Sequence, residues 1–238
     1  MSTSNTPAGH PENRRPAMAL KNIIEPSVFL LVLVGAYFAC AGRLNVILSW
    51  VYFVILLSNS VILTILMDPS LIEERARRTA DRKETDLPYA MILGRIGPIV
   101  IIIISGLDTR FGWTNMNMRV ASIIAAAIMV LGLLLTDWAV LKNRFFSSVV
   151  RIQKDRGHKA VTDGPYRYIR HPGYCGSMIY ILTTAIILRS VWALIPAIAV
   201  VISIVLRTAN EDRILDRELE GYREYSEKTK YRLIPYIW

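Results

Sequence analysis

A stretch of thirteen residues combines several residue types that proteins use to bind ligands. It covers 164–176 and reads Gly-Pro-Tyr-Arg-Tyr-Ile-Arg-His-Pro-Gly-Tyr-Cys-Gly. Glycine lets a backbone approach a ligand closely, and proline fixes a turn. The three tyrosines offer faces for an adenine or a cation, and Arg170 and His171 can hold a carboxylate. The stretch lies between two apolar segments, so we interpret it as a ligand site at a membrane face.

Arg207 and Glu211 form a second group that could do chemistry. They are four positions apart, so they share one face of a helix, and they follow directly on the last apolar segment. The spacing alone describes an exposed ion pair equally well. Their segment is joined to the one that follows the 164–176 stretch, and this placement favours a role at the same site.

Six apolar segments must position these residues. Hydrophobic residues make up 53% of the chain and the mean hydropathy is +0.36, which is too apolar for a soluble domain of this size. A membrane-spanning helix needs about 20 apolar residues, and two pairs of segments are joined so tightly that they indicate antiparallel helical hairpins. We predict an all-α, polytopic membrane bundle of about six transmembrane helices, over 26–42, 44–67, 89–107, 120–141, 173–189 and 191–206.

The basic residues predict how the bundle is oriented. Of the 28 Lys and Arg, 23 lie in the N-terminal tail, in 68–88, in 142–172 and after 206. Positive charge accumulates on the cytosolic side of membrane proteins, so we expect a multi-pass integral membrane protein with both termini in the cytosol. It would lie in the plasma or inner membrane of a prokaryote, or in the endoplasmic reticulum of a eukaryote. Lipid headgroups explain these charges better than nucleic acid does.

Charges inside the apolar segments are the next constraint. Arg95 and Asp137 lie at similar depths, and charges within a membrane are costly and usually paired, so we predict an ion pair between them. Neither the histidines His10, His158 and His171 nor the cysteines Cys40 and Cys175 have the spacing of metal ligands. We therefore expect no metal site.

These motifs together resemble the isoprenylcysteine carboxyl methyltransferase family, which is related to the phospholipid N-methyltransferases. The resemblance covers about 144–238 and rests on the 164–176 stretch, Arg207-x-x-x-Glu211-Asp212, Gly221-Tyr-x-x-Tyr225 and Arg232-Leu-Ile-Pro235. Asp212 stands where a second glutamate is common in the family. The N-terminal half is similar only in consisting of hydrophobic helices, which leaves the identity of the substrate open.

The resemblance implies that S-adenosyl-L-methionine is the methyl donor, bound at the cytosolic face. It implies a carboxylate acceptor on a prenylated or other lipidic substrate, with Arg207 and Glu211 as the catalytic residues on the substrate side. One further cofactor contact falls on Arg151 or Gln153, depending on the register. With Arg170 added from its chemistry, the other predicted cofactor contacts are His158, Lys159, Ala160, Val161, Tyr166, Arg170, His171, Pro172, Gly173 and Tyr174.

Three regions follow from this reading. Residues 1–22 lack the apolar core of a signal peptide and are expected to form a disordered cytosolic tail or an added leader. Residues 23–143 would form the first four transmembrane helices, with a cytosolic surface helix over 68–88. Residues 144–238 would form the methyltransferase core, with the cofactor loop, the last helical hairpin and a helix that continues into the cytosol until Gly221.

The chemistry leaves the class of acceptor open. Methyl transfer from a sulfonium is a direct displacement, which needs positioning more than a metal or a covalent nucleophile. A carboxylate is already ionised near neutral pH, and Arg207 could orient it through two hydrogen bonds. An amine would need a base, for which Glu211 is the candidate. The alternatives are therefore a phospholipid or amine N-methyltransferase, a sterol-type membrane reductase that uses NADPH, and a non-catalytic membrane protein.

Overall fold

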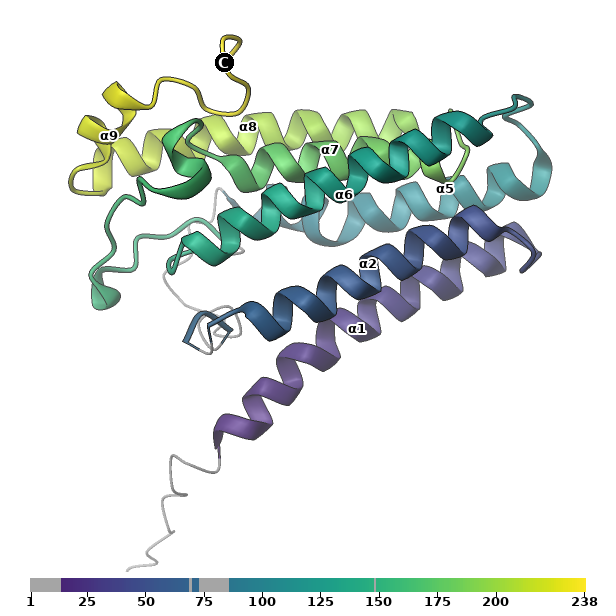
Figure 1. The fold of residues 1–238 in the computed structure, drawn as a ribbon, viewed down its shortest axis with the longest axis horizontal. Coiled ribbons are helices and arrows are strands. Elements are labelled where there is room, and N and C mark those ends of the chain that lie inside the picture. The colour runs from purple at the N-terminus through teal and green to yellow at the C-terminus, as the bar shows by residue number, and fades with distance from the viewer. Residues whose placement is uncertain (1–13, 69, 73–85, 148) are drawn as a thin grey trace, which may run out of the picture.

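The computed structural model describes residues 14–68, 70–72, 86–147 and 149–238, with side chains described from residue 26 on. Within these residues every regular element is a helix (Figure 1). Short π-helical and 3-10 turns occur at Ile92–Ile96 (η3), Lys154–Arg156 (η4) and Gly164–Arg167 (η5). The α-helices are α1 (Arg14–Ala41), α2 (Ile47–Leu66), α4 (Leu87–Met91), α5 (Gly97–Phe111), α6 (Arg119–Lys142), α7 (Pro172–Ile187), α8 (Leu194–Glu218) and α9 (Tyr222–Lys228).

Four of the described helical stretches are long and apolar enough to cross a bilayer, namely α2, Leu87–Phe111, α6 and α8. The apolar part of α1 (Pro26–Ala41) and α7 are shorter. All six predicted apolar segments are thus helical, and the prediction of an all-α membrane bundle is confirmed. Large apolar side chains on the outside of the bundle, such as Ile65, Leu131 and Ile202, are more than half exposed, as expected of a surface that faces lipid.

Close helix packing positions the start of α7, where the 164–176 stretch ends. The pair formed by α6 and α7 is the most extensive in the bundle. A Cβ atom added at Gly176 would collide with the backbone oxygen of Gly132 and with Thr136 on α6. Small residues let membrane helices approach this closely, and the close approach sets α7 firmly against α6.

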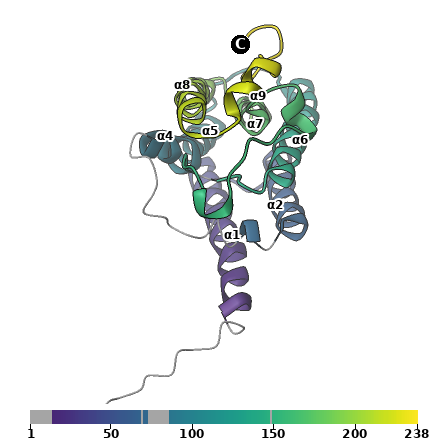
Figure 2. The same cartoon turned by 90° about the vertical axis from the view of Figure 1, so that its left-hand side faces the viewer.

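The bundle has two different ends. The tight connections between α1 and α2, α5 and α6, and α7 and α8 lie at the right of Figure 1. The start of α1, the connecting residues 143–147 and 149–171, and α9 with the C-terminal residues lie at the left. Figure 2 looks onto this left end, where α9 lies between α8 and α6. We call it the loop-rich end.

A buried carboxylate ties the loops together at the opposite end. Asp108 accepts hydrogen bonds from the backbone N–H of Thr114 at 2.7 Å, from Thr114 Oγ1 at 2.7 Å and from Ser190 Oγ at 2.6 Å. Because Ser190 lies between α7 and α8, Asp108 joins the loop after α5 to the α7–α8 turn. Its hydrogen bonds supply the partners that a buried carboxylate needs.

The N-terminal tail and the end of the last long helix differ from what the sequence predicted, and the surface helix expected over 68–88 is not tested. The helix α1 begins at Arg14, so 14–22 is helical and not part of a disordered tail, while 1–13 lies outside the described residues. The surface helix expected over 68–88 falls largely on 73–85, which also lies outside them. Gly221 takes a positive φ of 76° directly before α9, and α8 ends three residues earlier at Glu218.

The predicted ion pair between Arg95 and Asp137 is wrong. Asn59 Nδ2 approaches Asp137 Oδ1 at 3.4 Å, and the guanidinium carbon of Arg95 lies 5.3 Å from the ring centroid of Phe29. The physical reason is that equal depth does not make two helices neighbours. The turn that carries Arg95 packs against α8, whereas α6 packs against α7 and α2.

Candidate active site

A cavity at the loop-rich end collects most of the residues predicted to be functional. It encloses about 780 Å³ of empty space, the solvent at its mouth included. Glu211 lines it, and so do ten of the twelve predicted cofactor contacts. These ten are Arg151, His158, Lys159, Ala160, Val161, Tyr166, Arg170, His171, Gly173 and Tyr174.

Three predicted site residues are not among those that line the cavity. Gln153 is buried, donates from Nε2 to the backbone oxygen of Phe145 at 2.7 Å and accepts a 2.7 Å hydrogen bond from Arg156. It therefore shapes the loop, and of the two register alternatives Arg151 is the one at the cavity. Pro172 is the first residue of α7. Arg207 is buried on α8 with its guanidinium directed to Asp86.

The glycines of the 164–176 stretch are required by close contacts. Gly164 has a φ of +58°, and a Cβ atom there would lie 2.9 Å from Lys142 Cγ. A Cβ atom at Gly173 would lie 2.9 Å from the ring of Phe146, which lines the cavity. Positive φ and tight contact both favour glycine, so these residues set the course of the wall that carries the aromatic and basic side chains.

Tyr166 is fixed within the cavity wall by hydrogen bonds of its hydroxyl and its backbone oxygen. Its hydroxyl donates to the backbone oxygen of Ala139 at 3.2 Å and accepts from Asn143 Nδ2 at 3.2 Å. Its backbone oxygen accepts a 2.8 Å hydrogen bond from the hydroxyl of Tyr225 on α9. Burial raises the pKa of Tyr166, so the side chain is a neutral phenol that offers a fixed aromatic surface.

The ring of His158 is a second aromatic side chain that is held in place in the cavity wall. Its ring lies 4.5 Å from that of Phe145, and its Nδ1 accepts a 3.3 Å hydrogen bond from the backbone N–H of Gln153, which places the ring proton on Nε2. Burial, together with the positive charges of Arg151 and Arg156, lowers the pKa of His158 to about 4. The imidazole is therefore neutral at physiological pH.

Tyr174 links the cavity to α8. Its hydroxyl donates a 2.6 Å hydrogen bond to Glu211 Oε2, and its ring is stacked on that of His171 with a centroid separation of 5.9 Å. The guanidinium carbon of Arg207 lies 5.4 Å from the Tyr174 ring centroid. Among the described residues that line the cavity, Glu211 is the one carboxylate, so its charge is placed to attract a cationic group.

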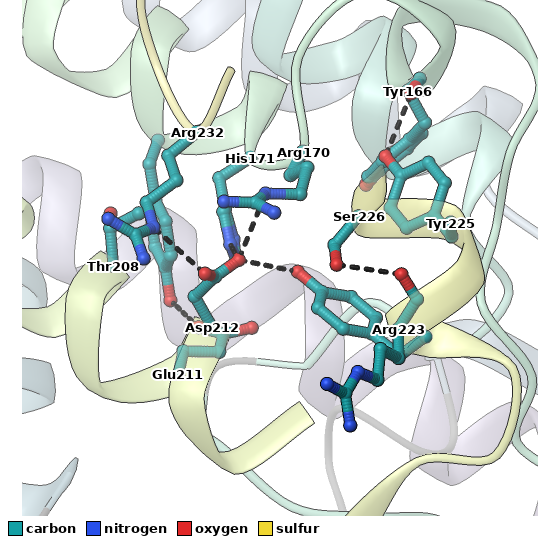
Figure 3. A network of polar contacts seen from close by, with 12 residues as sticks. Tyr166, Arg170, His171, Thr208, Glu211, Asp212, Arg223, Tyr225, Ser226 and Arg232 are labelled. Atoms are coloured by element: carbon teal, nitrogen blue, oxygen red, sulfur yellow. Dashed lines mark hydrogen bonds and ion pairs between the residues drawn. The ribbon is translucent and has the colours of Figure 1, made fainter. Parts of the chain in front are cut away.

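Asp212 is a hub that holds the cavity wall to the C-terminal residues (Figure 3). Its carboxylate lies 3.1 Å from Arg170 Nε and 3.3 Å from His171 Nε2. It also accepts 2.8 Å hydrogen bonds from the hydroxyl of Tyr222 and from Arg232 Nε. Two backbone hydrogen bonds, from Arg170 and His171 to the oxygens of 231 and 232, add to this link.

Several site residues were missed from the sequence. Tyr222 and Tyr225 contribute to the cavity wall from α9. Their motif could have identified them from the sequence, because it was part of the family resemblance. Phe145 and Phe146 also line the cavity and carried no signal beyond their aromatic type. Asp86 binds Arg207 across 121 positions of sequence, and nothing in its surroundings distinguished it from the other charges of 68–88.

Several known proteins are similar to parts of this chain. Residues 120–220 match a family model described as phospholipid methyltransferase. A probable protein-S-isoprenylcysteine O-methyltransferase of Oryza sativa subsp. indica is 31% identical over 124 residues, which are 49% of this chain and 62% of the relative. The protein-S-isoprenylcysteine O-methyltransferase of Schizosaccharomyces pombe is 37% identical over 65 residues, which are 27% of this chain and 28% of the relative.

A solved structure of the eukaryotic intramembrane Ras methyltransferase, isoprenylcysteine carboxyl methyltransferase, matches with a TM-score of 0.50 and 17% identity. The match covers 94% of this chain and 98% of that chain. In the matched segments the chain is similar to isoprenylcysteine carboxyl methyltransferases. At this identity the structural match shows the shared fold alone, and the chain spans 62% of the length of the Oryza relative.

The match to the phospholipid methyltransferase model lies in the second half of the chain. The family-model match includes α6, the cavity loop, α7 and α8. Both Arg207 and Glu211 lie within it, while Asp86 precedes it and Tyr225 follows it. The similarity to isoprenylcysteine methyltransferases confirms the motif-based resemblance. Tyr225 lines the cavity from beyond the segment matched by the family model.

Proposed function

We propose that the chain is an integral membrane methyltransferase that uses S-adenosyl-L-methionine. Its acceptor would be a carboxylate on a prenylated or other lipidic substrate at the cytosolic membrane face. The observation that carries the proposal is the cavity whose wall contains ten of the twelve residues expected to contact this cofactor. The relatives named as isoprenylcysteine methyltransferases support the class of acceptor.

The chemistry of the cavity wall fits this cofactor. Phe145, Phe146 and Tyr166 offer aromatic surface for an adenine. Arg151 and Arg170 lie where a carboxylate could be bound, because guanidinium forks match its geometry. Glu211 supplies the negative charge that a sulfonium or an ammonium requires. When bound, S-adenosyl-L-methionine supplies an activated methyl group.

The residues of this chain would contribute mainly by orienting the reactants. Tyr174 fixes the Glu211 carboxylate through a 2.6 Å hydrogen bond, and its own ring is held between His171 and Arg207. A carboxylate acceptor carries no proton to remove near neutral pH, so this arrangement needs no base. Effective positioning of two reactants contributes several kcal/mol to lowering a barrier, roughly 7–11 in well-oriented cases.

The cytosolic location rests on the distribution of charge. The cavity opens at the loop-rich end, which carries most of the 23 basic residues assigned to the inner side. By the positive-inside rule this end faces the cytosol. A lipidic substrate would then keep its apolar part among the helices and present its polar group to the cavity.

An amine acceptor is the second candidate. The family model that matches is described as phospholipid methyltransferase. In addition, Arg207 donates its Nε and Nη2 hydrogens to Asp86 at 2.7 and 2.8 Å, so these two donors already have a carboxylate partner. Glu211 would then act as the base for an amine.

Equilibrium binding tests the cofactor assignment. Purified protein in detergent should bind S-adenosylhomocysteine saturably, and NADPH should not compete. Ala160→Trp fills the cavity from its wall and should weaken binding at least about tenfold, or about 1.4 kcal/mol. Leu131→Trp, on the exposed outer face of α6, is the matched control and should bind normally. Binding of NADPH in place of S-adenosylhomocysteine would support a reductase and refute the proposal.

A further inference from the structure

Asp86 forms a buried ion pair with Arg207 that lies just outside the cavity. Its two carboxylate oxygens accept hydrogen bonds from Arg207 Nε at 2.7 Å and from Arg207 Nη2 at 2.8 Å. The side chain of Asp86 is 1% exposed and that of Arg207 is 4% exposed. Two parallel hydrogen bonds hold a guanidinium in one orientation, so Asp86 fixes where the Arg207 guanidinium lies.

The same carboxylate also holds a loop that lines the cavity. Asp86 Oδ2 accepts a 2.9 Å hydrogen bond from the backbone N–H of Val150. Val149, Val150 and Arg151 all line the cavity. One side chain at the start of α4 therefore connects α8 with the loop that carries Arg151.

The orientation of Arg207 affects the charge at the cavity. Arg207 and Glu211 lie four residues apart on one face of α8, and such pairs attract each other. While Arg207 is paired with Asp86, its guanidinium lies over the Tyr174 ring and Tyr174 holds Glu211. Without the negative charge of Asp86, Arg207 would be drawn to Glu211 and would compete with Tyr174 for its carboxylate.

We propose that Asp86 is a positioning residue for methyl transfer. It holds the guanidinium of Arg207 over the Tyr174 ring, so that the carboxylate of Glu211 keeps its hydrogen bond to Tyr174 and its negative charge stays at the cavity. The inference rests on the proposed function and adds a residue that lies outside the segment matched by the family model. If Asp86 had only a structural role, its substitution would lower the stability of the protein and leave the rate of methyl transfer by the folded protein unchanged.

The test compares Asp86→Asn with Asp108→Asn. Both carboxylates are buried and each accepts three hydrogen bonds, but Asp108 lies at the opposite end of the bundle. Methyl transfer is measured per S-adenosylhomocysteine-binding site, so unfolded protein is not counted. We expect Asp86→Asn to lower kcat at least about tenfold with less than about a threefold change in the KM for S-adenosyl-L-methionine, and Asp108→Asn to leave both near wild type.

Two further variants identify the route of the effect. If Asp86 acts through Arg207, the double variant Asp86→Asn/Arg207→Gln should lose no more activity than the worse single variant, whereas independent effects would multiply. Asp86→Glu keeps the charge but displaces the carboxylate, and should lower kcat at least about threefold even if Asp86→Asn does not fold. A kcat for both Asp86 variants equal to that of Asp108→Asn, or multiplicative losses, would overturn the inference. An inactive wild-type protein would instead refute the proposed function.

Discussion

The hydroxyl of Tyr174 donates a 2.6 Å hydrogen bond to Glu211 and thereby joins the first turn of α7 to α8. Tyr174 comes from the Gly/Pro/Tyr stretch, and Glu211 comes from the helix that follows it in the hairpin. The contact brings the two groups of chemically useful residues into one site. It also explains why a carboxylate on a membrane helix can lie at a cavity wall with its orientation fixed.

The first prediction concerns the charge of Glu211. Glu211→Gln keeps the shape of the side chain and an oxygen that can accept from Tyr174, so it removes little except the charge. We expect methyl transfer to fall at least about tenfold, or roughly 1.4 kcal/mol in the barrier. The matched control is Glu220→Gln at an exposed position. Steady-state rates equal in both variants would show that the Glu211 charge is not used.

A comparison of the activities lost in Arg207→Gln and in Glu211→Gln distinguishes a carboxylate acceptor from an amine acceptor. If the acceptor is a carboxylate, Arg207→Gln should be slower than Glu211→Gln, because the positive charge that Arg207 holds over the Tyr174 ring next to the cavity is lost. If the acceptor is an amine, Glu211→Gln should be slower, and the wild-type rate should rise with pH as the amine loses its proton. The measurement is kcat/KM for the three proteins between pH 6 and 9. Equal losses in all conditions would support neither assignment.

The pKa of His158 predicts how stability depends on pH. Its pKa is lowered to about 4 in the folded protein and is about 6.5 in an unfolded chain. Between these values the unfolded state binds a proton that the folded state does not. The contribution of His158 to stability is therefore complete above about pH 6.5 and is lost as the pH falls toward 4.

His158→Gln should remove this part of the pH dependence. The thermal midpoint in detergent, measured at pH 7.5 and pH 5, should fall less in the variant than in the wild type. A histidine NMR signal assigned to His158 that titrates near pH 6.5 in the folded protein would contradict the expectation.

The Asp212 hub predicts a link between the cavity wall and the C-terminal residues. Asp212→Asn removes the negative charge shared by Arg170 and Arg232, and breaking a buried ion pair in this way costs roughly 3–5 kcal/mol. We expect a lower thermal midpoint, weaker S-adenosylhomocysteine binding and faster tryptic cleavage at the exposed Lys230. Asp212→Glu keeps the charge and should be milder.

The exposed Asp216 provides the control for the hub. Asp216→Asn removes a carboxylate from the same helix without affecting the hub, and should unfold and be cleaved as the wild type is. Asp212→Asn with the same behaviour would mean that the hub contributes nothing to holding the C-terminal residues.

Hydropathy and motif spacing predicted much of this architecture because both are local properties of a sequence. The apolar segments became α1, α2, α5, α6, α7 and α8, and five residues of the Gly/Pro/Tyr stretch line one cavity. The direction of single side chains was harder to predict. Arg151 and Gln153 are two positions apart, yet one faces the cavity and the other supports the loop.

Long-range pairing could not be predicted from the same patterns. Asp86 and Arg207 are separated by 121 positions, and only the packed bundle brings them together. The expected pair of Arg95 and Asp137 failed for the converse reason, because matching depths say nothing about which helices are neighbours. Asp212, noted in the sequence only as a departure from the family pattern, is the centre of a network with four partners.

The most direct test of the central claim follows a labelled methyl group into product. Purified protein is incubated with methyl-labelled S-adenosyl-L-methionine and either N-acetyl-S-farnesylcysteine or phosphatidylethanolamine vesicles. We predict that label enters the farnesylcysteine as a base-labile methyl ester and that Ala160→Trp abolishes the transfer while Leu131→Trp does not. Base-stable label in the phospholipid would identify an amine acceptor. No transfer to either substrate, by protein that remains folded, would contradict the assignment of this chain as a methyltransferase of these lipidic acceptors.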